Sequence, residues 1–496
     1  MSFTVGRISP VQPFYNYPVH SDERIPAGPI VRTGPNSVSI NTISGLKGIY
    51  GSRTCNVEKS DWYRVIDSST GDSNTHSLID RHKHAFQRRV LDNALSDNAL
   101  KSAEEFIIDN VKIWCNRLAE GASKPGEWSS PKNMGDWATY LGYDIMGNLL
   151  FGKQFHCLDS DEHRYVPPLI INATKFVYLI GVSPVASFMR RLIRTPLMTL
   201  FAGQIGLDNE KFTKYAVYQM QERIAAEKDA SKQTKKDLAH YLLNARDPQT
   251  GKGFTEVQLT SESALLISAG SDTTSISIAA AFFYLLHNPN TLAKLTNAIR
   301  STFTSSDQLN GRALNNIQYL RACIDETLRL APAVPHHLPR TVLPGGLIID
   351  DNYFPPGTIV NAGPYVLHHN EGYYPDSFSF RPERWIVEPL VDDEDDDNIS
   401  SENRVAIARS AFCPFSIGPR GCAGKRVAYS EISYALAHFL LSYDVRLAPG
   451  EEWVGGGDPN HVCVERRKRE EYQIKECFLA SRDGPVVQVR PRRDVD

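Results

Sequence analysis

Apolar side chains recur at three- and four-residue intervals through much of the first 300 residues, which is the spacing of one face of an α-helix. The pattern is clearest over Ala103–Leu118, Asn209–Lys228 and Thr255–His287. From about residue 335, short apolar runs such as Leu347–Ile349 alternate with Gly and Pro turns. The pattern therefore predicts a mainly helical α+β fold with small β-sheets.

Both ends of the chain show hairpin patterns. Residues 30–50 alternate apolar and polar around a Gly-Pro-Asn turn, which predicts a short hairpin followed by a helix. A last apolar helix is predicted over Gly424–Leu441, and a terminal hairpin about Asp483-Gly484. Because no repeat or long linker divides the chain, we expect one domain over residues 30–496, preceded by an N-terminal extension, residues 1–29.

Composition excludes some classes of function. The chain has 496 residues and a net charge of -3, which gives no basic footprint for nucleic acid. Its eight cysteines are scattered without a CxxC pair, which fits a reducing compartment. The N-terminal extension lacks the roughly 18 consecutive apolar residues of a membrane span, and no other segment supplies them.

The strongest chemical signal is the loop Phe415-Ser-Ile-Gly418-Pro-Arg420-Gly421-Cys422-Ala-Gly424, which runs directly into the last predicted helix. Glycines let a tight loop approach a flat ligand, and the N-terminus of a helix stabilises a thiolate. A thiolate held in this way can ligate iron and favour cleavage of the O–O bond. Cys422 is therefore the candidate ligand, and the other cysteines are expected to be inert.

Two other patterns carry ordinary explanations when taken alone. Glu326 and Arg329 share one face of a predicted helix, where a surface ion pair is the default interpretation. The run Ala269-Gly270-Ser271-Asp272-Thr273-Thr274 places an acid and hydroxyls within the apolar helix 255–287, where burial is costly without a reason. A kinked helix with satisfied polar groups is the default there, and Gly270 would let a ligand come near the backbone.

The Cys422 loop resembles the haem-binding signature of the cytochrome P450 family, and the other motifs follow in that family's order from about residue 30 to the C-terminus. The resemblance implies the family's fold, a triangular prism with haem b between the long central helix and a proximal Cys loop and helix. It implies that the Cys422 thiolate is the axial ligand of the iron, and that Phe415 belongs to the cofactor-binding loop.

The same resemblance assigns roles to the two ambiguous patterns. Asp272 and Thr273 match the oxygen-activation motif, in which the acid and the first threonine relay protons to dioxygen. Glu326, Arg329 and Arg384, the last from Phe380-Arg-Pro382-Glu383-Arg384-Trp385, look like the structural charge cluster behind the haem. Their implied role is folding and haem retention.

Haem is dianionic through its propionates, so its site needs cations or other donors. His84 and Arg88 match the family's propionate-binding helix, with His84 standing where many members have Trp. Arg340 and Arg420 match two further propionate-binding positions.

The resemblance implies a monooxygenase that inserts one oxygen atom from O2 into a small apolar organic substrate. Electrons would come from a separate NADPH-cytochrome P450 reductase, with cytochrome b5 as an alternative donor, and Lys425-Arg426 with Arg88-Arg89 would form its dock. Residues 30–36 are similar to fungal members, which suggests a secondary-metabolite pathway. We also expect a monomer. The family's place is the cytosolic face of the endoplasmic reticulum membrane, and without a visible anchor a soluble cytoplasmic protein is the alternative.

Other activities stay open at this stage. The same site could run desaturation, epoxidation, ring closure or phenol coupling. An O2-independent haem isomerase or dehydratase is a second alternative, against which Asp272-Thr273 argues, and a haem sensor is a third. By analogy the substrate pocket draws on residues 60–80, 170–205, 262–273 and 331–339 and on Phe478. This set includes His336 and His337, which are expected to form hydrogen bonds with the backbone or to face solvent.

Overall fold

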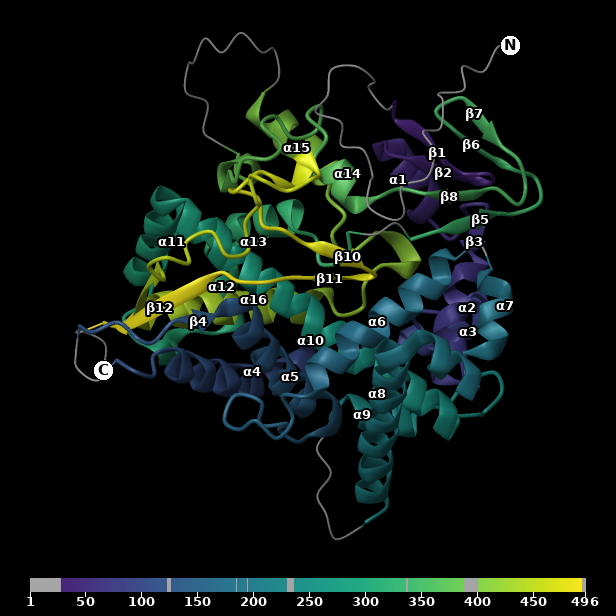
Figure 1. The fold of residues 1–496 in the computed structure, drawn as a ribbon, viewed down its shortest axis with the longest axis horizontal. Coiled ribbons are helices and arrows are strands. Elements are labelled where there is room, and N and C mark those ends of the chain that lie inside the picture. The colour runs from purple at the N-terminus through teal and green to yellow at the C-terminus, as the bar shows by residue number, and fades with distance from the viewer. Residues whose placement is uncertain are drawn as a thin grey trace.

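The computed structural model describes residues 28–492, except 123–125, 184, 194, 230–235, 336–337 and 388–399. Helices make up most of it (Figure 1). Their bounds are α1 Ile43–Tyr50, α2 Arg64–Thr70, α3 Arg81–Ala94, α4 Asp97–Leu118, α5 Met134–Phe151, α6 Val166–Val182, α7 Ala186–Leu192, α8 Pro196–Lys228, α9 Leu238–Asn244, α10 Glu256–His287, α11 Pro289–Thr302, α12 Gly311–Asn315, α13 Gln318–Leu330, α14 Pro364–His368, α15 Ser401–Ala411 and α16 Lys425–Ser442.

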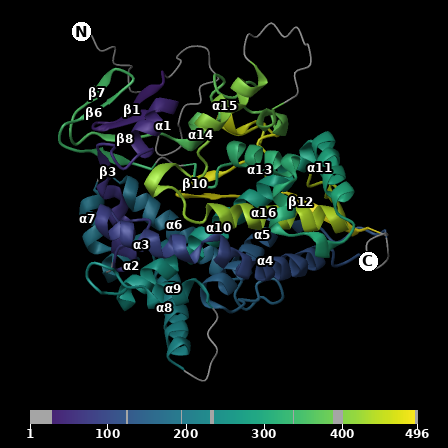
Figure 2. The same cartoon turned by 180° about the vertical axis from the view of Figure 1, so that it is seen from behind.

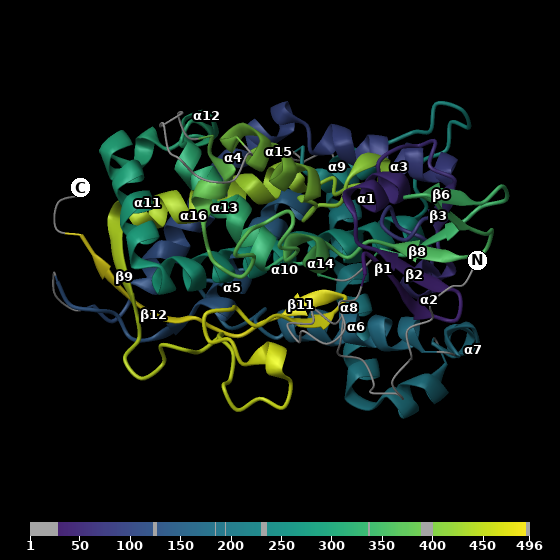
Figure 3. The same cartoon turned by 90° about the horizontal axis from the view of Figure 1, so that it is seen from above.

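The strands are short, and they form small sheets at the two ends of the molecule (Figure 3). One end holds a sheet of order β1-β2-β8-β5-β3 and the β6-β7 pair, and the other end holds β4-β12-β9. The remaining pair, β10-β11, lies between them. The strand bounds are β1 Ile30–Gly34, β2 Ser37–Ile40, β3 Val57–Lys59, β4 Lys132–Asn133, β5 Arg340–Val342, β6 Leu347–Ile349, β7 Asn352–Phe354, β8 Ile359–Asn361, β9 Tyr443–Leu447, β10 Lys475–Cys477, β11 Leu479–Ser481 and β12 Val486–Pro491.

Helix α10 runs through the middle of the helical layers and packs against α5 and α16 (Figure 2). It begins with a capping box, in which the Thr255 hydroxyl accepts from the Gln258 N–H and the Gln258 side chain accepts from the Thr255 N–H. Its second half, from Thr274 to Leu285, is buried. A helix that is apolar on all sides and buried in this way serves as the core around which the other helices pack.

Two glycines allow α5 and α10 to approach closely. A Cβ atom on Gly142 of α5 would lie 2.6 Å from the Ser271 carbonyl oxygen of α10. A Cβ atom on Gly270 would collide with the Met146 thioether of α5. Gly270 therefore serves helix packing, a role that helical periodicity alone does not reveal; that it also lets a ligand come near the backbone stays a prediction.

The predicted helices and the N-terminal hairpin are confirmed, and the predicted terminal hairpin is wrong. The last hairpin turns at Phe478, between β10 and β11, instead of at Asp483-Gly484. Strand β12 then leaves that hairpin and pairs with β9 and β4. Residues 1–27 of the predicted N-terminal extension lie outside the described residues.

Within the described residues, one helix is long and apolar enough to cross a membrane, namely α10. Two thirds of its apolar window, 67%, is buried inside the protein. The core helix of a globular protein has the same length and composition, so this helix carries no argument for a membrane span.

We expect Gly142→Ala to lower the free energy of unfolding by about 2 kcal/mol, because the added Cβ meets backbone that can move only if α5 and α10 separate. Helix propensity alone predicts the opposite, a gain of about 1 kcal/mol. Denaturant unfolding followed by circular dichroism measures the difference. The control is Gly28→Ala, where a Cβ meets nothing within 4 Å. A Gly142→Ala protein that is as stable as the parent would contradict this packing argument.

Candidate active site

Cys422 ends a tight loop that leads into α16. Its backbone N–H donates to the Phe415 carbonyl oxygen at 2.9 Å, which closes the loop. Gly418 has a φ of 68° and lies against the Tyr50 carbonyl, so no side chain fits there. The N–H groups of Gly424 and Lys425 bond to the cysteine sulfur. The loop therefore presents the sulfur to the N-terminus of a helix, as a thiolate ligand requires.

The Cys422 side chain is accessible. Among the cysteines whose side chains are described, it alone is exposed. Protein nevertheless surrounds it closely enough for burial to raise the pKa of its thiol, while the two N–H groups, Arg88 and Lys425 act in the opposite direction. An accessible sulfur with N–H donors and nearby cations is a site for a ligand that draws electron density from a thiolate.

Thr273 lies on a half-buried face of α10. It is partly accessible, like most positions from Leu265 to Gly270, whereas Asp272 and Thr274 on either side of it are buried. The Thr273 hydroxyl donates to the Ala269 carbonyl oxygen at 2.7 Å. This face and Cys422 are the two candidate walls of the predicted cofactor space.

Asp272, the predicted partner of Thr273, lies on another side of the helix. Its buried carboxylate is 3.5 Å from the guanidinium of Arg482, which follows β11. Arg482 also donates to the hydroxyls of Ser275, at 2.6 Å, and Thr139. Burial raises the pKa of Asp272, and Arg482 opposes that rise. The acid is thus held by an arginine that is 210 residues away in sequence.

Glu326, Arg329 and Arg384 form one buried cluster, as predicted. The Glu326 carboxylate accepts from Arg329 and from Arg384 at 2.9 Å, and from the Trp385 indole and the Arg381 N–H at 3.0 Å. Burial alone would raise the pKa of Glu326, but the two guanidinium groups and the N–H hold it below its usual value. The Arg329 guanidinium also donates to the carbonyl oxygens of His368 and Ser377. The cluster therefore joins α13 to the stretch of chain that leads to Arg384.

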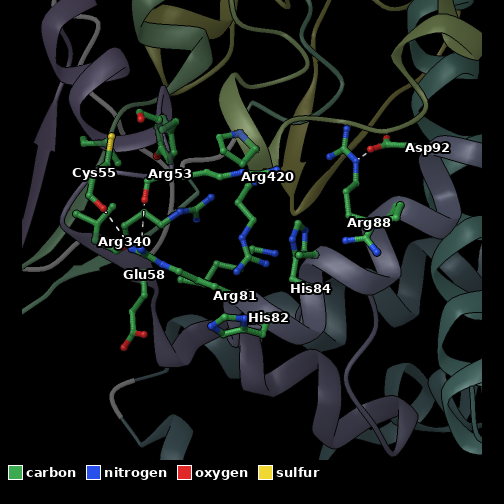
Figure 4. A pocket seen from close by; sticks show the side chains of 18 residues that line it. Arg53, Cys55, Glu58, Arg81, His82, His84, Arg88, Asp92, Arg340 and Arg420 are labelled. Atoms are coloured by element: carbon green, nitrogen blue, oxygen red, sulfur yellow. Dashed lines mark hydrogen bonds and ion pairs between the residues drawn. The ribbon is translucent and has the colours of Figure 1, made fainter. Parts of the chain in front are cut away.

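A cavity of about 490 Å³ beside the Cys422 loop is lined by several cationic side chains. The structure brings four of the predicted cofactor-binding residues to its wall, namely His84, Arg88, Arg340 and Arg420 (Figure 4). Phe415 does not line it and instead packs its ring 5.3 Å from that of Tyr429. The cavity thus joins α3, β5 and the Cys422 loop around one cationic space.

The four residues do not contribute equally to that charge. His84 is neutral, because burial and the nearby cations lower its pKa to about 2. Arg88 is bonded to the Gly421 carbonyl oxygen and paired with Asp92 at 2.7 Å. His84 can therefore act as an uncharged N–H donor, and part of the Arg88 charge is already balanced.

Arg340 and Arg420 have no carboxylate partner among the described residues. Arg340 donates to the Tyr63 hydroxyl at 3.0 Å and to carbonyl oxygens, and Arg420 donates to the carbonyl oxygens of Leu78 and Ile79. Burial, with Arg340 second, lowers the pKa of Arg420 to about 10. Cations without a protein anion, with Arg340 buried and Arg420 partly buried, fit a ligand that brings its own negative charge, and a haem with two propionates is such a ligand.

The segments expected to form the substrate pocket meet in part. Phe478 has a φ of 76°, a strained value for a bulky residue, and its ring lies 5.4 Å from that of Trp62 and 5.5 Å from that of His76. Residues 60–80 are also tied to α10, because Thr75 donates twice to the Glu262 carboxylate, at 2.5 and 2.7 Å. His336 and His337 lie outside the described residues.

The motifs did not reveal three buried ionisable groups in this part of the protein. Lys59 lines the cationic cavity, Arg482 holds Asp272, and Glu431 of α16 bonds to Thr274, where burial raises its pKa to about 8. The partners of Lys59 and Arg482 come from distant segments, so spacing along the chain gives no signal for them. The apolar surroundings of Glu431 in a predicted helix are the signal that could have been followed.

Comparison with known proteins places these features in a family. The family model described as Cytochrome P450 matches residues 28–454. Cytochrome P450 monooxygenase fscF of Fusarium equiseti is 33% identical over 481 residues, which cover 94% of this chain and 85% of that protein. A cytochrome P450 monooxygenase of Gibberella zeae is 36% identical over 458 residues, which cover 91% of this chain and 98% of that protein. The crystal structure of cytochrome P450DA heme domain matches with a TM-score of 0.71 at 18% identity, covering 94% of this chain and 90% of that chain, which confirms the predicted fold.

We expect Glu326→Gln to lower the free energy of unfolding by about 3 to 5 kcal/mol, because it leaves two buried guanidinium groups without their anion. Urea denaturation measures the loss. The matched control is Asp376→Asn, which breaks the exposed ion pair with Arg381 and should change stability by less than about 1 kcal/mol. Equal effects of the two substitutions would show that the Glu326 cluster is not the structural element described here.

Proposed function

Since the chain belongs to the cytochrome P450 family of monooxygenases, we propose that it binds haem b through Cys422 and inserts one oxygen atom from O2 into a small apolar organic substrate. We also propose that a separate NADPH-dependent reductase supplies the electrons and that the product belongs to a fungal secondary-metabolite pathway. We further propose that the protein works at the cytosolic face of the endoplasmic reticulum membrane.

One observation carries the haem assignment. An accessible cysteine sulfur at a helix N-terminus belongs to a loop that lines a cavity in which two arginines have no carboxylate partner among the described residues. A thiolate and a pair of unmatched cations are together what a metal macrocycle with two carboxylates requires. When bound, thiolate-ligated haem supplies the activation of dioxygen.

Residues of the chain itself would deliver protons to dioxygen. Thr273 Oγ1 lies on the accessible face of α10 and can pass its hydrogen to dioxygen in the cofactor space. Asp272 is the nearest acid in sequence, but its carboxylate is paired with Arg482. Delivery of a proton from Asp272 therefore requires that its contact with Arg482 loosen or that water bridge the two sides of the helix.

Electron delivery needs a docking face near the Cys422 loop. Lys425, Arg426 and Arg89 are exposed there, on the first turn of α16 and on α3. A cationic face of this kind favours an acidic partner and raises its rate of association. We propose that the reductase docks on this face.

The proposed reaction requires both NADPH and O2, and this requirement can be tested. Purified full-length protein with reductase should form product only when both NADPH and O2 are present. Product formation without either of them would instead indicate an O2-independent isomerase or dehydratase. Candidate substrates are found beforehand as compounds that shift the spin state of the haem in absorption spectra.

We expect Thr273→Ala to uncouple the enzyme, so that NADPH is still consumed while product per NADPH falls at least about tenfold. The physical reason is loss of the hydroxyl that hands on the proton. Thr260→Ala is the matched control, because Thr260 makes the same bond to the carbonyl four residues earlier, at 3.0 Å, but lies near the start of α10. An unchanged ratio of product to NADPH in Thr273→Ala would remove this residue from the mechanism.

A further inference from the structure

Phe415 of the Cys422 loop packs against a tyrosine that the proposed reaction does not use. We propose that Tyr429 of α16 and Asp325 of α13 form a redox pair, in which the phenol gives one electron to the oxidised cofactor and its proton passes to the carboxylate. The pair would protect the protein when no substrate consumes the oxidising equivalents. This inference rests on the proposed haem site, because haem is the group that Tyr429 would reduce.

The hydrogen bond between the two side chains is short. The Tyr429 hydroxyl donates to Asp325 Oδ1 at 2.6 Å. A bond of this length between a hydroxyl and a carboxylate is charge-assisted, and a proton crosses it without a large movement of either oxygen. Oxidation makes the proton of a phenol strongly acidic, so an acceptor that is already in place lowers the free energy needed to remove the electron. Asp325 is such an acceptor.

Arg321 couples the loss of the electron to the loss of the proton. Its Nε atom donates to both oxygens of Asp325 at 3.0 Å, and its guanidinium lies 3.6 Å from the centre of the Tyr429 ring. A cation over the ring opposes a positive charge on it, so the electron leaves only together with the proton. Burial and then Asp325 raise the pKa of Tyr429, so the phenol keeps its proton at rest.

The pair lies between the cofactor loop and solvent. The Tyr429 ring is 5.3 Å from that of Phe415, whose carbonyl oxygen accepts from the Cys422 N–H at 2.9 Å. Tyr429 also lies about 6 Å along the axis of α16 from Lys425, whose N–H bonds to the cysteine sulfur. Tyr429 is 8% exposed, whereas the Arg321 side chain beside it is 46% exposed. The electron therefore has a short path inward, and the proton a short path to solvent.

The electron and the proton each have a donor and an acceptor. Once hydrogen peroxide has oxidised the cofactor, Tyr429 gives it one electron as the O–H bond of the phenol breaks. The proton binds to Asp325, and a neutral tyrosyl radical remains. Ascorbate, or NADPH through the reductase, returns the electron, and Asp325 returns the proton.

The competing role for the pair is structural, as a bond between α13 and α16, which pack together. Tyr319 offers a matched comparison, because its hydroxyl donates to Glu383 at 2.8 Å and Lys294 of α11 lies 4.3 Å from its ring centre. It thus combines a carboxylate and a cation as Tyr429 does, but it lies in the first turn of α13. A structural role predicts that the two tyrosines respond alike to an oxidant, and a redox role predicts that they differ.

The experiment mixes full-length haem-loaded protein with hydrogen peroxide in the absence of substrate and measures the tyrosyl radical by electron paramagnetic resonance after rapid freezing. We expect Tyr429→Phe to lower the radical signal at least about fivefold, while Tyr319→Phe stays within about twofold of the parent. Asp325→Asn keeps the shape of the side chain but removes the proton acceptor, and it should lower the signal as much as Tyr429→Phe does. Ascorbate should abolish the signal of the parent, and Tyr429→Phe should lose its Soret absorbance faster under peroxide.

Circular dichroism and the Soret band after reduction with carbon monoxide show whether each variant is folded and loaded. An undiminished signal in Tyr429→Phe or in Asp325→Asn would overturn the proposal. So would a parent that forms no radical although its thiolate-type Soret band is intact. Absence of that band from the parent would instead defeat the proposed haem-thiolate site.

Discussion

Arg340, which is buried, and Arg420, which is partly buried, line one cavity and donate only to uncharged oxygen atoms of the described residues. A buried charge of this kind costs several kcal/mol unless an anion balances it. The residues that bear it belong to β5 and to the loop before Cys422. The dianionic cofactor would therefore stabilise the arrangement of these elements as well as supply the chemistry.

Glu326 provides the contrast. Its charge is matched inside the protein by Arg329 and Arg384, and its remaining lone pairs accept from Trp385 and Arg381. That cluster needs no ligand, so it can hold α13 and the following segment before a cofactor arrives. The charges of the Glu326 cluster are thus balanced within the protein, whereas those of Arg340 and Arg420 would be balanced by the bound cofactor.

Sequence alone predicted the features that depend on short spacing. The Cys422 loop, the pair Glu326 and Arg329 and the long helix could be recognised because their residues are close in the chain. Features that depend on contacts between distant segments were missed or wrong. Lys59 meets Arg340 only through strand register, and Arg482 meets Asp272 across 210 residues. The last hairpin turns at the strained Phe478, where no local turn signal marks it.

The account depends most on Cys422 as the thiolate ligand of haem iron, and the carbon monoxide difference spectrum of the reduced full-length protein tests this directly. The account predicts a thiolate-type Soret band in the parent protein and its loss in Cys422→Ser, with Cys413→Ser unaffected because Cys413 is buried. A parent spectrum without the thiolate-type band, or a band that survives in Cys422→Ser, would contradict it.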